Sequence, residues 1–153
     1  MAPERPSVTM TDGEDLDAAI DAYHDADASI IRGDTEWYRQ VYSHRDDATL
    51  ANPFGGIWRG WDQIREGLDR AASLYRDGEF IANDTVARHV SGDFTYLVEL
   101  QRFRAKLAGS SEFSEGILRT TSVLRREDGG WRVVHRHADP RGEATPPDPM
   151  ALT

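Results

Sequence analysis

Apolar residues recur at three- and four-residue spacing between residues 14 and 32, which is the period of one face of an α-helix. The positions on this face are Leu16, Ala19, Ile20, Tyr23, Ala26, Ile30 and Ile31. The pattern predicts an amphipathic helix that ends at Gly33. Asp27 falls between Tyr23 and Ile30, so it lies either at the edge of the apolar stripe or inside it, where its carboxylate needs a partner or a shifted pKa.

Two shorter helices and a short strand are expected before the middle of the chain. Asp34 is a favourable N-cap for the second helix. Residues 48–52 favour a strand, which Pro53 and the glycines after it end. Asp62 is the expected cap of a third helix, and Gly78 its end. The apolar face of this third helix is Ile64, Leu68, Ala71, Ala72 and Tyr75.

After Gly78 the pattern changes to the alternation typical of β-strands. The expected strands are 79–90, 94–107, 112–126 and 131–138. Ser91-Gly92-Asp93 and Asp128-Gly129-Gly130 separate them in pairs, and both are typical hairpin turns. Three N-terminal helices followed by long antiparallel strands predict an α+β domain, with the helices on one face of a curved sheet. Such an arrangement encloses a pocket, and the outer face of the sheet is free for a partner.

The chain has 153 residues, which fits one domain with one core. Five of its seven prolines lie in residues 1–13 and 141–153, which we expect to be tails on either side of a domain at 14–140. No apolar run approaches the ~18 residues that a membrane span needs. The N-terminus lacks the basic-then-apolar order of a signal peptide, so a cytoplasmic protein without membrane contact is the default expectation.

The formal net charge is −9, which argues against a nucleic-acid partner because phosphate backbones are bound by clustered basic residues. Arginines do cluster on the last three expected strands, where alternation would spread them over a solvated sheet face. There is no cysteine, which excludes disulfides, thiolate catalysis and cysteine metal sites. No phosphate-binding loop, dinucleotide fingerprint or nucleophile elbow is present, and we expect no cofactor.

The last expected strand carries the side chains best suited to acid–base chemistry. Alternation puts His135, His137 and Asp139 on the same face as Trp131 and Val133, and this more apolar face should look inward. Imidazole titrates near neutral pH, so a histidine in a pocket can give or take a proton while a carboxylate orients it. Alternatively, the two histidines form hydrogen bonds across the sheet. A metal site is the least favoured interpretation, because no other His or Glu completes a ligand set.

Several short motifs resemble those of one known group. They are Gly33-Asp34, Asp46-Asp47-Ala48-Thr49, Asn52-Pro53-Phe54-Gly55, Arg59-Gly60 and Gly130-Trp131-Arg132-Val133-Val134-His135-Arg136-His137. Together they resemble the ketosteroid isomerase and SnoaL-like cyclase group of the nuclear transport factor 2 superfamily. The resemblance covers residues 15–140 and implies a cone-shaped fold, in which three N-terminal helices pack on a curved, mainly antiparallel sheet around a pocket. Because this fold hosts unrelated activities, the motifs specify function less sharply than fold.

The positions that carry catalysis in ketosteroid isomerase differ in this chain. The general base of that enzyme precedes the Pro-Phe-Gly of the turn, where this chain has Asn52. The oxyanion hole of that enzyme uses a tyrosine and a protonated aspartate. Their positions correspond to Ala26, with Tyr23 one turn away, and to Ser122. An amide cannot accept a proton at neutral pH, which argues against steroid isomerisation by that mechanism.

Two hypotheses follow. The first is a SnoaL-like enzyme without cofactor that performs isomerase, cyclase or hydratase chemistry on a small, largely apolar carbonyl compound, polyketide- or steroid-like. His137 would transfer the proton with His135 or Asp139 orienting it, and Asn52 and Ser122 would donate hydrogen bonds to the oxyanion. The remaining expected site residues are Asp27 for catalysis and Tyr23, Trp58, Tyr96, Val98, Arg102 and Ser122 for substrate binding. For Trp58 the favoured alternative is that it anchors the third helix to the sheet together with Trp61. The second hypothesis is a non-catalytic ligand-binding or dimerisation module, and the resemblance implies a homodimer through the outer sheet face.

Overall fold

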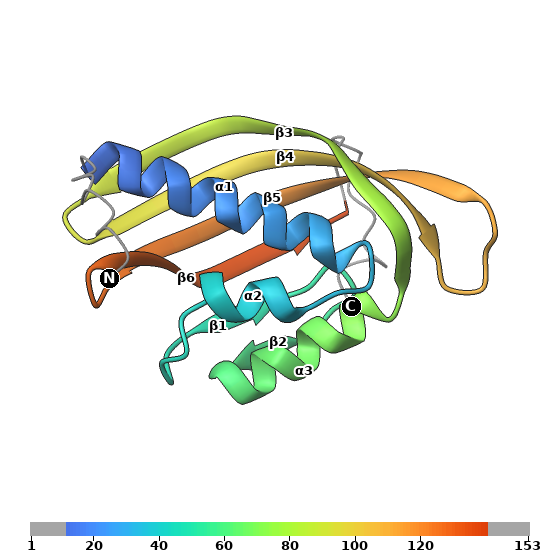
Figure 1. The fold of residues 1–153 in the computed structure, drawn as a ribbon, viewed down its shortest axis with the longest axis horizontal. Helices are drawn as coiled ribbons and strands as arrows, with labels where there is room; N and C mark the ends of the chain where they lie inside the picture. The colour runs from blue at the N-terminus through green and yellow to red at the C-terminus, as the bar shows by residue number, and fades with distance from the viewer. Residues whose placement is uncertain (1–11, 141–153) are drawn as a thin grey trace, which may run out of the picture.

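The computed structural model describes residues 12–140, which form a six-stranded sheet with helices on one face (Figure 1). In chain order the elements are α1 (Asp12–Ile30), α2 (Glu36–Val41), β1 (Thr49–Ala51), β2 (Ile57–Arg59), α3 (Trp61–Ala72), β3 (Tyr75–Ser91), β4 (Phe94–Leu107), β5 (Phe113–Glu127) and β6 (Gly130–Asp139). The predicted tails lie outside the described residues, except for Asp12 and Gly13, which already belong to α1.

The strand order in the sheet is β2-β1-β6-β5-β4-β3. The four long strands, β3 to β6, pair antiparallel with their neighbours, in agreement with the two hairpin turns of the sequence. β1 runs parallel to β6, so the sheet is mixed. In Figure 1 the long strands curve behind α1, and α2 and α3 lie beside β1 and β2. The other face of the sheet carries no helix from the described part of the chain.

The apolar face of α1 packs against the sheet and forms much of the core. Leu16, Ile20, Tyr23 and Ile30 are all at most 8% exposed, which confirms the helical stripe read from the sequence. Removing an apolar side chain of this size from water contributes about 1.5–3 kcal/mol. The stripe therefore fixes the rotation of α1 about its axis, and with it the direction in which the polar side chains of the helix point.

β3 begins earlier than the sequence pattern predicts. It starts at Tyr75, and Gly78 lies within the strand instead of ending a helix. The N–H of Gly78 donates to the carbonyl of Ile31 (3.0 Å), and a Cβ at Gly78 would lie 2.6 Å from that oxygen. The glycine therefore permits a close backbone contact between β3 and the end of α1. The pattern does not predict β2, whose three residues follow the glycines that were expected only to end the preceding strand.

A β-bulge at Val134 interrupts the last strand. Val123 of β5 pairs with His135, but the next residue, Leu124, pairs with Val133, so Val134 is an extra residue in β6. Val133 and Val134 are both buried, at 1% and 8% exposed. Two consecutive side chains of β6 are therefore removed from water, which strict alternation does not allow.

The bulge turns every later side chain of β6 to the opposite face. Arg136 and Ala138 are buried, whereas His137 is exposed. The prediction that His135, His137 and Asp139 face the interior is therefore wrong. One inserted residue shifts the two-residue period of a strand, so the face that looks inward before the bulge looks outward after it.

Candidate functional site

A small cavity lies between α1, α3 and the helix-covered face of the sheet. Its volume is about 40 Å³, enough for a few water molecules at roughly 10–15 Å³ each. Its apolar walls include Ile30, Leu68, Tyr75, Phe80 and Leu118. Its polar lining consists of Asp27, Tyr38, Asn52 and Arg136. The cavity thus combines apolar walls with a compact set of charged and hydrogen-bonding groups.

Asp27 is the centre of this polar set and is 2% exposed. One of its carboxylate oxygens accepts a hydrogen bond from the hydroxyl of Tyr38. The other accepts hydrogen bonds from Nε2 of Gln101 (2.9 Å) and from a guanidinium nitrogen of Arg136 (3.2 Å). Side chains from α2, β4 and β6 therefore hold the carboxylate of α1 in place.

Arg136 extends the same network along the sheet. Its guanidinium donates to the hydroxyl of Tyr23 (2.8 Å) and to Oε1 of Gln101 (3.0 Å). The hydroxyls of Tyr23 and Ser122 lie 2.6 Å apart and share a hydrogen bond. The network thus joins α1 and α2 to β4, β5 and β6 through buried polar groups.

Burial changes the proton affinity of the groups in this network. Desolvation raises the pKa of the Asp27 carboxyl above its ordinary value, and the charge of Arg136 and the hydrogen bond from Gln101 oppose the rise. Desolvation likewise raises the pKa of the Tyr23 hydroxyl, again against Arg136. Burial alone would lower the pKa of Arg136, but the charge of Asp27 and the hydrogen bond to Tyr23 raise it. Asp27 is therefore a more basic carboxylate than an exposed aspartate, and it lies beside a permanent positive charge.

A second buried carboxylate, that of Glu99, lies on the same face of β4 as Gln101. Glu99 is 1% exposed, and one of its oxygens lies 2.8 Å from Nε2 of His24. Its other oxygen has no hydrogen-bond partner among residues 12–140. Burial lowers the pKa of His24, but the hydrogen bond and the charge of Glu99 outweigh burial and raise it above the usual value. Both buried carboxylates, Asp27 and Glu99, thus have a basic partner.

Asn52 lines the cavity just after β1. Its amide nitrogen donates to the backbone carbonyl of Gly67 in α3 (3.0 Å). Phe54, two residues later, is 53% exposed, and its ring centre lies 5.6 Å from that of Tyr75. Asn52 therefore attaches the turn between β1 and β2 to α3, and Phe54 lies at the part of the cavity wall that reaches solvent.

The fold brings four of the residues predicted from the sequence to this region. Tyr23, Asp27 and Ser122 belong to one hydrogen-bond network. Asn52 lines the same cavity as Asp27. Their roles in binding or catalysis stay predictions.

The three polar residues at the end of β6 do not line this cavity. Nδ1 of His135 lies 2.8 Å from the hydroxyl of Thr49, which agrees with the alternative interpretation of hydrogen bonds across the sheet. Asp139 forms two hydrogen bonds of 2.8 Å with Arg119, and His137 is exposed. Burial and the charge of His137 lower the pKa of His135. The proton-transfer role predicted for His137 therefore loses its geometric basis.

Three residues predicted to bind substrate lie on the outer face of β4. They are Tyr96, Val98 and Arg102, and Tyr96 is 45% exposed. The alternate residues Glu99 and Gln101 face the helices and are buried. Both faces of this strand carry polar residues, so alternation identifies two faces without showing which one points inward. The expected lining by these three residues is therefore wrong.

Trp58 anchors α3 instead of lining the cavity. A Cβ at Gly67 would lie 2.6 Å from the indole ring of Trp58, so helix and ring are in direct contact. Because Gly67 has no side chain, α3 can pack closely on β2. The contact removes Trp58 from the set of candidate ligand-binding residues.

Sequence reasoning missed Arg136, Gln101 and Tyr38. Strict alternation assigns Arg136 to the outer face, and the adjacent pair Val133-Val134 is the one signal of a bulge that would have reversed this assignment. Gln101 and Tyr38 follow no motif. Only the folded structure identifies them as site residues, because the packing of α1 and α2 on the curved sheet brings both side chains to Asp27.

Residues 12–140 contain neither a cluster of side chains arranged for a metal ion nor a helix that could span a membrane. No group of three or more His, Asp or Glu side chains in this part of the chain is arranged to hold a metal ion. Within the same residues, no helix is long and apolar enough to cross a membrane.

Solved structures define the class of fold. An NTF2-like superfamily protein from Salmonella enterica serovar Typhimurium superposes with a TM-score of 0.69 at 21% identity, over 85% of this chain and 91% of that chain. A proposed dehydratase of the NTF2-like family from Streptomyces avermitilis gives 0.67 at 20% identity, over 83% and 94%. The CaMKII hub of S. rosetta gives 0.65 at 18% identity, over 87% and 99%. At these identities the likeness shows the fold alone, which is that of the nuclear transport factor 2 superfamily.

The sequence then defines the family. The model of the SnoaL-like domain matches residues 16–139, which span the structure from the first turns of α1 to the end of β6. The chain therefore belongs to the SnoaL-like domain family, and the resemblance seen in its motifs is confirmed. No curated protein matches the sequence significantly.

Proposed function

We propose that the protein is a small-molecule enzyme that uses Asp27 as a general base on a carbonyl compound inside the cone. The supporting observation is a buried carboxylate of raised pKa that lines an apolar-walled cavity beside a guanidinium. A general base works best when its pKa approaches the working pH, and burial moves the pKa of Asp27 in that direction. The charge of Arg136 suits it to stabilise the negative charge that develops on a carbonyl oxygen.

In the proposed reaction Asp27 removes a proton from the carbon next to the carbonyl group, and the electron pair moves onto the carbonyl oxygen. Arg136 stabilises this oxyanion through its charge and its N–H groups. In an isomerisation, Asp27 returns the proton to another carbon of the same substrate. In a cyclisation, the enolate carbon attacks a second carbonyl, whose oxygen then takes the proton from Asp27. Neither sequence consumes a co-reactant.

Substrate size follows from the cavity. Its volume of about 40 Å³ is far below the roughly 300–1,000 Å³ of typical ligand sites. Substrate entry therefore requires the segment 53–56 to move away. Gly55 and Gly56 have φ values of 90° and 86°, a region that glycine adopts readily, and Phe54 beside them already reaches solvent. This requirement favours a compact substrate over a steroid-sized one.

A ligand screen followed by an activity assay tests the proposal. Thermal stabilisation by small β-dicarbonyl and α,β-unsaturated carbonyl compounds identifies ligands, and turnover of those ligands tests catalysis. Asp27→Asn should lower kcat by ~10²–10⁴-fold, because it removes the base. His137→Ala is the control and should leave kcat unchanged, since His137 is exposed on the outer face. Loss of turnover in His137→Ala with normal turnover in Asp27→Asn would contradict the assignment.

A non-catalytic, self-associating module is the second candidate. It is favoured by Phe94 and Tyr96, aromatic residues that are 49% and 45% exposed on the helix-free face of the sheet. The hydrogen bonds to both oxygens of Asp27 also suit a structural ion pair. A stable dimer that neither binds nor converts any compound of the screen would favour this candidate over the enzyme.

A further inference from the structure

A surface cleft outside the cone is lined by three arginines from three parts of the chain. They are Arg39 of α2, Arg45 of the segment that follows it and Arg132 of β6. The cleft has a volume of about 310 Å³, at the lower end of the range of about 300–1,000 Å³ for small-molecule sites. In a chain with a net charge of −9, this grouping of guanidiniums requires an explanation.

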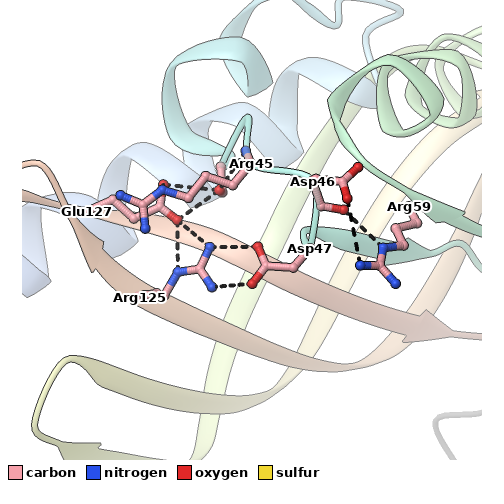
Figure 2. Close-up of polar contacts among 7 residues, drawn as sticks. Arg45, Asp46, Asp47, Arg59, Arg125 and Glu127 are labelled. Carbon is pink, nitrogen blue, oxygen red and sulfur yellow. Dashed lines mark hydrogen bonds and ion pairs between the residues drawn. The ribbon is translucent and has the colours of Figure 1, made fainter.

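The buried carboxylate of the cleft already accepts hydrogen bonds from other groups. One oxygen of Glu127 accepts hydrogen bonds from two guanidinium nitrogens of Arg125 (2.9 and 2.7 Å) and lies 2.8 Å from the hydroxyl of Ser43. Arg125 also makes two hydrogen bonds to Asp47 (2.7 and 2.9 Å). Figure 2 shows Arg125 between these two carboxylates, with Arg45 on the other side of Glu127. Glu127 is thus satisfied without Arg39 or Arg132.

The arginines of the cleft are left with unused binding capacity. No ion pair joins the side chain of Arg39 or Arg132 to another residue between 12 and 140. Arg45 lies 3.7 Å from Glu127 and 3.8 Å from Asp128, too far for hydrogen bonds, and its side chain is 51% exposed. Asp128 is 94% exposed, so water screens its charge strongly. The cleft therefore presents positive charge that its own carboxylates do not neutralise.

The backbone that carries Arg45 is held in place. The N–H of Ser43 donates to the carbonyl of Val133 (2.8 Å), and Nε2 of His44 lies 2.8 Å from the carbonyl of Arg39. In Figure 2 the next part of the segment is tied to β5 through Asp47. Because this backbone is already fixed, ligand binding has to order only the arginine side chains and not the segment that carries them.

We propose that this cleft binds a small organic anion through its phosphate or carboxylate group, with Arg39, Arg45 and Arg132 around that group. Guanidinium binds both oxyanions through paired, charge-assisted hydrogen bonds. The organic part of the ligand lies beside His44, whose ring is stacked on Trp61 at a centroid distance of 4.3 Å. The site is separate from the cavity at Asp27 and does not depend on the proposed enzymatic activity.

Titration of the ¹⁵N-labelled full chain with phenyl phosphate, benzoate and inorganic phosphate tests the proposal by amide chemical shifts. We expect saturable shifts in residues 39–47 and 127–132, with a Kd of about 1 mM or tighter for at least one probe. Tighter binding of phenyl phosphate identifies a phosphate ligand, and tighter binding of benzoate identifies a carboxylate. Arg39→Gln and Arg132→Gln should each weaken binding about tenfold or more, because each removes charge-assisted hydrogen bonds.

Arg102→Gln is the matched control, because it removes the same charge from the outer face of β4, outside the cleft. Its Kd should equal that of the parent protein. Equal weakening in Arg102→Gln would show a response to net charge alone, and the absence of saturable shifts with all three probes would show that no site exists. Either result overturns the proposal. Arg39 is exposed, so Arg39→Gln decides the question even if Arg132→Gln fails to fold.

Discussion

At the scale of single residues, the candidate site depends on an ion pair that has lost nearly all contact with water. Asp27 and Arg136 are 2% and 7% exposed, and the desolvation of two charges can exceed their mutual attraction. Hydrogen bonds with Tyr38, Gln101 and Tyr23 offset part of that cost. A buried ion pair is weak evidence for stability, so the presence of this pair does not by itself show that it stabilises the fold.

The pair of His24 and Glu99 leads to a prediction about pH. Because the pKa of His24 is raised in the folded protein, its contribution to stability is complete below about pH 6.5, the ordinary histidine pKa, and is lost as the pH rises through the folded pKa. His24→Gln should remove this contribution, since glutamine has no proton to lose. Urea unfolding should show a steeper fall in the free energy of unfolding from about pH 6 to about pH 8.5 for the parent than for His24→Gln.

His89→Gln is the control for this measurement. His89 is exposed on β3, and its ring centre lies 5.9 Å from that of Tyr96, away from Glu99 on the inner face. This variant should keep the slope of the parent between the same two pH values. An unchanged slope in His24→Gln would mean that Glu99 does not hold the imidazole as the structure indicates.

At the scale of elements, the contact between Gly67 and Trp58 sets the distance of α3 from the sheet. Gly67→Ala gains about 1 kcal/mol of helix propensity, but overpacking against a fixed ring typically costs about 1–3 kcal/mol. A Cβ at this position would lie 2.6 Å from the indole, so we expect the cost to exceed the gain. Urea unfolding should therefore show a lower free energy of unfolding for Gly67→Ala, by up to about 2 kcal/mol.

Gly13→Ala is the matched control for this substitution. Gly13 also lies in a helix, α1, but a Cβ there would meet no atom of residues 12–140 within 4 Å. This variant should be as stable as the parent or more stable, by up to about 1 kcal/mol. Equal stabilisation by both substitutions would show that Trp58 can move and does not hold α3 in place.

The elements that were predictable from the sequence repeat a pattern over many residues. The stripe of α1 spans several turns, and the long strands are marked by alternation and by hairpin turns, so both periods are visible. β1 and β2 have three residues each and show no period, and only β1 was expected, from the turn residues that follow it. Gly78 was predicted to end a helix because glycine is common at helix ends. In the structure it permits a close contact with Ile31, which no local sequence pattern encodes.

Only some residues of the candidate site were predictable from the sequence, because some lie in regular elements and others follow the β-bulge at Val134. Tyr23 and Asp27 follow the regular period of a long helix, which places both on the buried face of α1. Arg136 lies two residues beyond the bulge at Val134, so the alternation that correctly turns Val133 inward gives the wrong face for it. In the sequence the bulge is marked only by the adjacent pair Val133-Val134, and its position is established by the pairing of β5 with β6.

At the scale of the whole molecule, the helices cover one face of the sheet and leave the other open (Figure 1). The open face carries a row of aromatic and aliphatic side chains on β4, which are Phe94, Tyr96, Val98 and Leu100. A contiguous apolar surface of this kind marks an interaction site in a soluble protein. The bulge that turns Arg136 inward also places His135 and His137 on this open face.

We predict that the protein forms a homodimer through this open face. Tyr96→Glu should weaken association at least ~100-fold, because it replaces an aromatic contact with a charge that must be desolvated. Sedimentation velocity at micromolar concentrations measures this as a shift from dimer to monomer. Trp37→Glu is the control, since it puts the same charge on an aromatic residue of α2 that is 50% exposed, and it should remain dimeric. A parent protein that sediments as a monomer, or a Trp37→Glu variant that dissociates as readily as Tyr96→Glu, would show that this face does not hold the dimer together.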